Sequence, residues 1–298
     1  MHRLLRNVSF VLACLPVLAG FGSRADAGDC RPAAIERLRA QAPEGFAIYQ
    51  KIADKKFFTG WLSCSEDQRG VSTAVHETVH HITGDIDAYP LIRGGQLKRP
   101  HEAEAFFAPS MIAGKFKPSD FVTTYLRPGS ASSSTDFLYL LDELNAYTHD
   151  LNTAVKLSRA ANYVTDGDEV DHRDGLAALM AFVAVYVERA EQSEPATWSG
   201  LREPRVARTV SELWGQAEQV MASSCGIPKF GGEDRPMIRQ FCQAGPQGAL
   251  AKILGRPAVC PTACLKPMPV ASHEDTELVD EMPTGSVRYP AAKSVARR

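Results

Sequence analysis

The sequence has almost no net charge, and this excludes two classes of binding protein. It holds 33 Lys and Arg residues against 35 Asp and Glu residues, which gives a formal net charge of −2 over 298 residues. A protein that binds nucleic acid mainly through phosphate contacts carries a basic excess. A protein that binds an anionic membrane surface through charge carries a polybasic segment. We therefore expect no nucleic-acid partner and no charge-driven membrane attachment.

The sequence also lacks an apolar run suited to a membrane-spanning helix, which needs about 20 apolar residues. The segment Val8–Phe21 is interrupted by Pro and Gly, and Gly175–Val187 is too short. The first segment follows a basic start and precedes Ala25-Asp26-Ala27, a pattern typical of a secretory signal peptide. We predict that residues 1–27 are a signal peptide, that no stable membrane insertion remains after cleavage, and that the protein is periplasmic or secreted. A lipoprotein anchored at Cys14 is the weaker alternative.

Cysteine is scarce, but the predicted cleavage leaves an even set. The cysteines beyond residue 27 are Cys30, Cys64, Cys225, Cys242, Cys260 and Cys264. An even set in an exported chain predicts disulfides. The pairing does not follow from sequence alone, and we take Cys30–Cys64, Cys225–Cys242 and Cys260–Cys264 as the expected set. A thiolate zinc site at Cys260 and Cys264 is the alternative, which export disfavours.

Hydrophobic periodicity predicts a mainly helical chain with little sheet. Helices are expected over residues 31–42, 45–55, 68–83, 100–107, 119–126, 136–161, 175–187 and 206–223. A strand is expected at Phe57–Leu62, and a hairpin is expected where residues 88–92 and 96–98 flank Arg93-Gly94-Gly95. Gly84 should end the 68–83 helix in the left-handed conformation. The predicted fold class is α+β, mainly helical, with a small sheet beside the 68–83 helix and a helical C-terminal half.

The chain is expected to form one domain after the signal peptide. Residues 28–265 form this domain, with the candidate metal site described below inside residues 28–162 and a helical, Cys-rich support in residues 163–265. Residues 266–298 are polar and contain Pro, so we predict a disordered tail. The acidic segment Asp166–Asp171 lacks a full calcium-binding loop, and a solvated turn is expected there.

One motif carries chemistry. His76-Glu77-Thr78-Val79-His80 matches the pattern HExxH and lies on the predicted 68–83 helix. Residues four apart share a helix face, so both imidazoles can reach one zinc ion. Glu77 projects beside the metal, where it can accept a proton from the attacking water. The apolar stripe of this helix turns both histidines toward the interior.

These residues resemble the HExxH motif of the zincin superfamily of metallopeptidases. The resemblance covers the His76–His80 helix and a later acidic helix, not the whole chain. It implies a catalytic zinc ion with three protein ligands and an open position. The metzincin form of the motif fails, because Thr83 and Ile86 stand where that form has Gly and His. An aspartate-type zincin would use Asp85 or Asp87, whose surroundings match that type only loosely.

The glutamate type, or gluzincin, takes its third ligand from a later helix, often with Ala three residues after the Glu. Glu102 and Glu104 are candidates near an expected helix start, where the helix dipole alone favours an acidic residue. We favour Glu143, which lies at the edge of a core-facing leucine stripe in the 136–161 helix. Ala146 would let that helix pack closely on the histidine helix.

Several further side chains are candidates for stabilising a transition state. Tyr147 lies one turn after Glu143 on the same helix face, where it can hydrogen-bond a ligand or stabilise an oxyanion. His149 and His172 are weaker candidates for this role. His81 points away from the two motif histidines by helix geometry, so a surface or supporting role is expected.

The favoured function is an exported zinc-dependent metallopeptidase of gluzincin type. Zn²⁺ is the expected cofactor and a peptide or protein the expected substrate. One alternative is a non-catalytic exported binding or scaffold protein with a degenerate or structural zinc site, which a closed four-ligand site would favour. A second is a zinc amidase acting on a non-protein amide, which needs the same zinc and base. No feature of the sequence predicts an oligomeric state.

Overall fold

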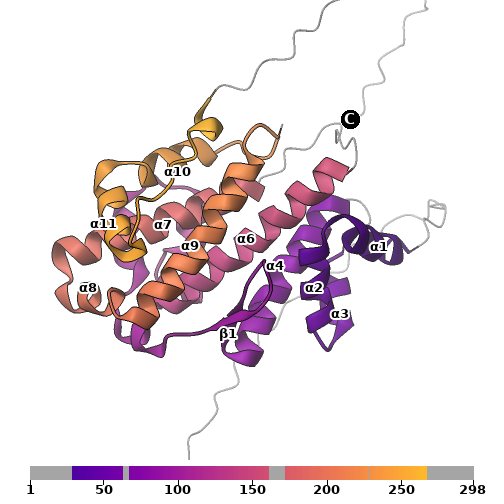
Figure 1. The fold of residues 1–298 in the computed structure, drawn as a ribbon, viewed down its shortest axis with the longest axis horizontal. Helices are drawn as coiled ribbons and strands as arrows, with labels where there is room; N and C mark the ends of the chain where they lie inside the picture. Colours follow the sequence, from indigo (N-terminus) through magenta and orange to yellow (C-terminus); the bar gives the residue numbers. More distant parts are fainter. Residues whose placement is uncertain (1–28, 63–66, 161–171, 228, 267–298) are drawn as a thin grey trace, which may run out of the picture. The chain divides into compact units, whose positions relative to one another are not determined.

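The computed structural model of the protein describes residues 29–62, 67–160, 172–227 and 229–266. The predicted signal peptide, the acidic segment 166–171, Cys64 and the predicted tail beyond residue 266 lie outside the described residues. The described chain is mainly helical with one small two-stranded sheet, which confirms the coarse fold class (Figure 1). Within these described residues, no helix is both long and apolar enough to cross a membrane.

Three short helices cover one side of the helix that carries the HExxH motif. They are α1 (Arg31–Gln41), α2 (Pro43–Lys51) and α3 (Lys55–Gly60), and they pack on α4 (Asp67–Ile86). Their apolar faces form a small core with the stripe of α4, in which Leu38, Ile48, Phe58, Val75 and Val79 are buried. This packing covers the apolar stripe of α4. The face of α4 that carries His76 and His80 is not part of this small core.

The predicted strand at Phe57–Leu62 is wrong, because residues 55–60 form helix α3. Asp54 caps the start of this helix by accepting a hydrogen bond from the backbone nitrogen of Lys56. The ammonium of Lys55 donates to carbonyl groups at the end of α2, including Ile52 at 2.7 Å. The end of α2 and the start of α3 are thus both capped, and this outweighs the strand preference of Phe57 and Phe58. Phe58 is buried as a helix residue.

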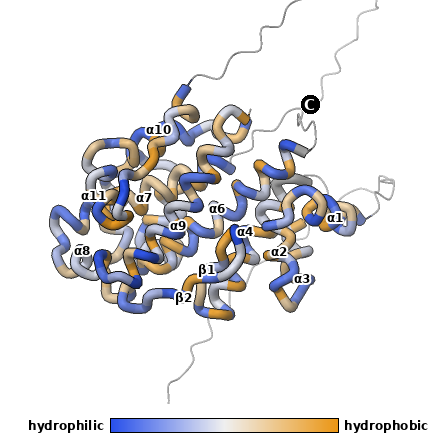
Figure 2. Tube along the Cα trace, viewed as in Figure 1, coloured by the Kyte–Doolittle hydropathy of each residue, from blue (hydrophilic) through white to orange (hydrophobic). Residues whose placement is uncertain are grey.

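The larger core lies on the other side of α6 (Phe137–Ala160), which is the central helix of the domain. It packs against α4, α7 (His172–Ser193) and α9 (Pro204–Ser224). Leu140, Leu144 and Leu151 belong to the larger core, whereas Ala146 belongs to the small core with the stripe of α4. The predicted close approach at Ala146 is confirmed. Figure 2 shows polar and apolar residues mixed along α6 and α9, whose apolar residues are the buried ones.

The hairpin and its flanks connect α4 to α6. Strands β1 (Ala88–Pro90) and β2 (Gln96–Lys98) pair antiparallel, which confirms the predicted hairpin, and β1 lies against α4. Gly84 does not end α4; the helix runs to Ile86, and Asp87 takes the left-handed conformation with φ of 51°. An aspartate tolerates this conformation better than most residues, so the left-handed residue that ends the helix lies three positions beyond the glycine.

Short helical turns follow the hairpin. They are η1 (His101–Ala105), η2 (Pro109–Lys115), α5 (Asp120–Tyr125) and η3 (Ser132–Ser134). The helix expected over residues 100–107 is therefore a short 3₁₀ turn, whereas the helix expected over 119–126 is confirmed. The hydroxyl of Ser119 accepts a hydrogen bond from the backbone nitrogen of Val122 and starts α5.

The Cys-rich region folds into α8 (Pro195–Leu201), α9, α10 (Asp234–Phe241), α11 (Ala244–Leu254) and η4 (Thr262–Leu265). Two disulfides join it, Cys225–Cys264 and Cys242–Cys260. The expected pairs Cys225–Cys242 and Cys260–Cys264 are wrong. Since α11 reverses the chain, the segment after it returns to the ends of α9 and α10, and each cysteine of that segment meets a different helix end.

A polar clasp joins the start of α7 to this Cys-rich region. The guanidinium of the buried Arg173 donates to Asp234 and to the carbonyl oxygen of Ser224, the latter at 2.9 Å. The carboxylate of Asp174 accepts from the backbone nitrogens of Gly232 and Glu233 at 3.1 and 3.0 Å. The first residue of α7, His172, is thereby held in a defined position.

Candidate metal centre

Helices α4 and α6 bring three potential metal ligands together. His76 and His80 lie one turn apart on α4, with their Nε2 atoms 3.1 Å from each other. Oε2 of Glu143, on α6, lies 3.8 Å from Nε2 of His76 and 3.4 Å from Nε2 of His80. In a tetrahedral zinc site with bonds of about 2.05 Å, ligand atoms lie about 3.3 Å apart. The three separations bracket this value, so the geometry suits one small ion.

The Glu143 carboxylate has an unmet requirement that a cation would satisfy. Its Oε2 atom is buried and has no hydrogen-bond partner among the described residues. Leaving a buried carboxylate oxygen without a partner is costly. Two imidazole nitrogens and one carboxylate oxygen are a ligand set that zinc accepts. The close polar neighbours recorded for this oxygen are the two imidazole nitrogens, so a cation shared among the three atoms would satisfy it.

Asp142 supports the centre from behind and was not anticipated from the sequence. Its Oδ2 atom lies 2.7 Å from Nδ1 of His80. A carboxylate on Nδ1 fixes the ring so that Nε2 faces the metal position. The available signal was its place beside Glu143, because adjacent helix residues diverge by about 100° and can reach opposite sides of one imidazole.

The electrostatics of the two histidines differ in a way that suits a cation. Burial lowers the pKa of His76 well below its usual value, and the charge of His80 lowers it further, so its ring is neutral with a free lone pair. Burial also lowers the pKa of His80, but the carboxylates of Asp142 and Glu143 more than offset it and raise that pKa to about 10. The two carboxylates thus stabilise positive charge at the centre of the group.

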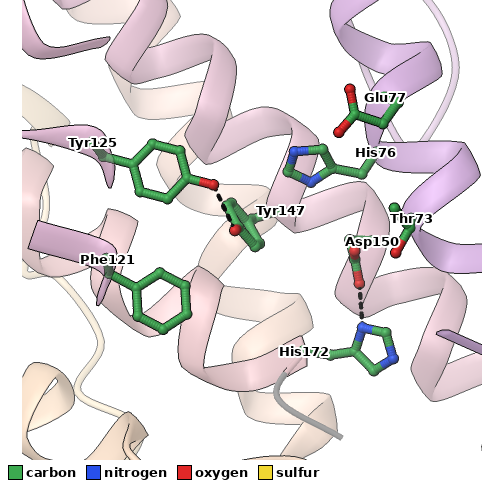
Figure 3. A pocket seen from close by; sticks show the side chains of 8 residues that line it. All are labelled: Thr73, His76, Glu77, Phe121, Tyr125, Tyr147, Asp150 and His172. Carbon is green, nitrogen blue, oxygen red and sulfur yellow. Dashed lines mark hydrogen bonds and ion pairs between the residues drawn. The ribbon is translucent and has the colours of Figure 1, made fainter. Parts of the chain in front are cut away.

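A cavity of about 180 Å³ opens beside the centre. Its described lining residues are Thr73, His76, Glu77, Phe121, Tyr125, Tyr147, Asp150 and His172 (Figure 3). Glu77 comes from the same helix as the ligands and is half-buried at the cavity wall. Burial raises its pKa, and the nearby Glu143 adds to this against the opposing effect of His80. Glu77, the predicted base, therefore lines the same cavity as His76.

Tyr147 stands against the first ligand. Its ring packs edge-on to that of His76 with centroids 4.5 Å apart, and its hydroxyl lies 2.7 Å from that of Tyr125. Figure 3 shows these two hydroxyls meeting in the cavity. Burial raises the pKa of both phenols, so both are neutral hydrogen-bond donors at ordinary pH. Tyr147 thus lines the cavity beside His76, and its hydrogen bonding to a ligand stays a prediction.

A histidine–aspartate pair forms the far wall of the cavity. Nδ1 of His172 lies 2.5 Å from Oδ1 of Asp150, and both side chains are buried. In Figure 3 this pair lies below Tyr147, away from Glu77. His172, a weaker candidate from the sequence, lines the cavity. Asp150 was not anticipated, although it lies one turn beyond Tyr147 on α6.

The remaining candidates lie elsewhere. His149 is buried with Nε2 donating to the carbonyl oxygen of Pro90 at 3.0 Å, so it anchors the hairpin. His81 stacks on Phe57 and lies 3.3 Å from Asp85, as its helix position predicts. The other acidic candidates are exposed or half-buried and paired with basic groups: Asp87 and Glu104 with His101, and Glu102 with Arg205.

Searches for similar proteins add no constraint: no family model, no curated protein and no solved structure matches the chain. Within the described residues, His76, His80 and Glu143 form the one group of three or more His, Cys, Asp or Glu residues arranged to hold a metal. Of these three residues, His76 also lines the cavity.

Proposed function

We propose that this protein is an exported zinc-dependent metallopeptidase of gluzincin type. In this proposal His76, His80 and Glu143 hold the zinc ion, and Glu77 transfers protons during hydrolysis of a peptide bond. The convergence of Nε2, Nε2 and Oε2 beside a cavity that Glu77 lines is the observation that carries it. The two disulfides favour an oxidising compartment, in line with export.

Each residue of the cavity has a role in this proposal. A bound zinc ion would supply a Lewis acid that acidifies water and polarises a carbonyl group. The Glu77 carboxylate accepts a proton from the attacking water and returns it to the leaving amine. The hydroxyl of Tyr147 and the imidazole of His172 donate hydrogen bonds to the oxygen on which negative charge develops. Asp150 accepts a hydrogen bond from Nδ1 of His172 and fixes the ring, and in the imidazolium form Nε2–H is then the second donor of that ring.

The experiment is metal analysis of the purified protein followed by peptidase assays. We expect about one zinc per chain in the wild type, and loss of zinc in His76→Ala and Glu143→Ala. Glu77→Gln should keep the zinc and lose hydrolysis, by a factor of about 100 or more. Glu212→Gln, an exposed change on α9, is the matched control and should retain both.

Two outcomes would overturn the proposal. One is a protein that stays free of metal after zinc is supplied, which would show that His76, His80 and Glu143 form a structural cluster only. The other is iron in place of zinc, because the same two-His, one-carboxylate set also serves iron oxygenases. Hydrolysis that survives Glu77→Gln would leave the zinc site in place and remove Glu77 from the reaction.

A further inference from the structure

A second cavity lies away from the metal centre, between α6, α9 and the hairpin. Its volume is about 210 Å³, and its described lining residues are Ile92, Arg93, Asn152, Val155, Lys156, Arg159, Gln216, Gln219, Val220 and Ser223. Figure 1 shows α6 and α9 running side by side here, with the hairpin near them. Asn152 follows Glu143 by two and a half turns of α6, so the two side chains leave opposite faces of the helix. This cavity is thus separate from the candidate metal centre.

The cavity is strongly basic. Arg93, Lys156 and Arg159 contribute three positive charges, and none of its described lining residues is acidic. Lys156 has a carboxylate partner, Glu44, at 3.4 Å. The guanidinium of Arg93 donates to the side-chain oxygen of Gln219 at 2.6 Å, and that of Arg159 to the carbonyl oxygen of Ser223 at 2.8 Å. These acceptors are neutral, so two guanidinium charges stand without a counter-charge among the described contacts.

A buried amide supplies a second, independent indication of a ligand. Asn152 lines the cavity and is 8% exposed, and its NH₂ group has no hydrogen-bond partner among the described residues. A buried donor without a partner costs free energy. Its neighbour Gln219 has its oxygen engaged by Arg93, which leaves its NH₂ group for a ligand. Donors and positive charges therefore gather here, with no acidic acceptor among the described lining residues.

We propose that this cavity binds an oxyanion of the phosphate class. Guanidinium groups bind phosphate through paired, charge-assisted hydrogen bonds, and two of them with a half-neutralised ammonium suit a doubly charged anion. A carboxylate would neutralise one charge only. The oxyanion joins three elements that are distant in sequence: the tip of the hairpin through Arg93, α6 through Asn152 and Arg159, and α9 through Gln219.

The test is calorimetric titration of the whole protein with inorganic phosphate at low, constant ionic strength. Metal is first removed with a chelator, so that phosphate bound by a metal ion does not contribute. We expect saturable binding of one phosphate per chain, weakened about tenfold in Arg93→Gln and in Arg159→Gln, each of which removes a charge-assisted contact. Both arginines are exposed, so neither change should affect folding. Arg208→Gln, an exposed arginine of α9 outside the cavity, is the control and should bind phosphate as the wild type does.

Further ligands define the source of the anion. O-phosphoserine that binds as tightly as phosphate supports a phosphoryl group on a larger molecule, whereas weaker binding supports free phosphate. Acetate that binds as tightly as phosphate would overturn the assignment to a doubly charged anion. The site itself is refuted by an absence of saturable binding, or by Arg93→Gln and Arg159→Gln proteins that bind phosphate like Arg208→Gln.

Discussion

Oδ2 of Asp142 lies 2.7 Å from Nδ1 of His80, while Oε2 of the next residue, Glu143, lies 3.4 Å from Nε2 of the same ring. Two consecutive carboxylates of α6 thus hold one imidazole from opposite sides. Asp142 fixes the orientation of the ring and makes Nε2 a better electron-pair donor to a metal ion. Glu143 lies beside Nε2 as a further potential ligand. This relationship gives Asp142 a measurable role, although it is not itself a candidate ligand.

Replacing Asp142 should weaken metal binding without removing it. We expect Asp142→Ala to lower zinc affinity by about 10- to 100-fold, because the His80 ring loses its fixed orientation. Competition with a chelator of known affinity measures this. Asp85→Asn, which alters a carboxylate beside the surface residue His81, is the control. Equal affinities in Asp142→Ala and the wild type would show that His80 is positioned by packing alone.

The two tyrosine hydroxyls of the cavity should differ in importance. Under the proposed function, Tyr147→Phe should lower kcat by about 10- to 100-fold with zinc retained, because it removes a donor beside the metal position. Tyr125→Phe removes the partner hydroxyl, 2.7 Å away, and should cost less. Steady-state kinetics of both variants at equal zinc content test this. A larger loss of kcat in Tyr125→Phe than in Tyr147→Phe would show that Tyr125 is the more important donor.

Gly175 of α7 lies directly against the ring of Tyr147, which leaves no room for a side chain. A Cβ atom at this position would lie 2.1 Å from Cε1 of Tyr147, so Gly175→Ala must displace the ring or the helix. We expect a loss of about 1–3 kcal/mol in the free energy of unfolding, despite the better helix propensity of alanine. Denaturant unfolding measures it.

Gly215 of α9 is the matched control for this change. The nearest atom to a Cβ there is a guanidinium nitrogen of Arg256 at 3.8 Å, which is ordinary contact. Gly215→Ala should be neutral or should stabilise by about 0.5–1 kcal/mol. If the two variants had the same stability, the close approach of Gly175 and Tyr147 would not matter to folding.

His149 should make the protein sensitive to acid. Burial lowers its pKa to about 4, below the value near 6.5 of an unfolded chain. The unfolded state then binds the proton more readily, so stability is complete above about pH 6.5 and falls as the pH drops toward 4. The fall should approach about 3 kcal/mol, since each pKa unit is worth about 1.4 kcal/mol.

The variant His149→Gln isolates this effect. The glutamine NH₂ group can still donate to the carbonyl oxygen of Pro90, and it does not titrate. Unfolding free energies measured between pH 4 and 7 should fall less steeply than those of the wild type. Parallel curves would show that other groups cause the acid sensitivity.

The disulfides can be mapped directly. We expect digestion without reduction to yield peptides linked through Cys225–Cys264 and Cys242–Cys260. The double change Cys242→Ser and Cys260→Ser should destabilise the protein by about 3 kcal/mol, because it frees a loop of 18 residues in the unfolded state. A peptide joining Cys225 to Cys242 would contradict this pairing.

The sequence predicted those parts of the fold that depend on local patterns. The stripes of α4 and α6, the apolar middle of α7 and the glycine turn of the hairpin all follow from residues close together in the chain, although α7 extends beyond the expected 175–187 at both ends. The residues His76, His80 and Glu143 were found because helix spacing and the place of Glu143 beside a leucine stripe are readable without coordinates. The proximity of the two helices was suggested by Ala146.

The parts that could not be predicted depend on partners far away in sequence. Helix α3 replaced a strand because Lys55 caps the preceding helix, a contact that no residue pattern announces. The cysteine pairing depends on how α11 reverses the chain. Asp142 and Asp150 resemble ordinary helix carboxylates until His80 and His172 are placed beside them.

The clasp at the start of α7 joins the cavity wall to the segment between Cys225 and Cys242. Arg173 and Asp174 hold the segment around residues 230–234, and the residue before them, His172, is part of the cavity wall. We expect reduction of Cys225–Cys264 to loosen that segment, because the bond ties the end of α9 to η4, while His76, His80 and Glu143 stay in place. We therefore expect reduced protein to bind metal normally and yet lose protection of His172 against chemical modification, which mass spectrometry can measure. The protein would then complete its cavity only after reaching a compartment that oxidises its cysteines.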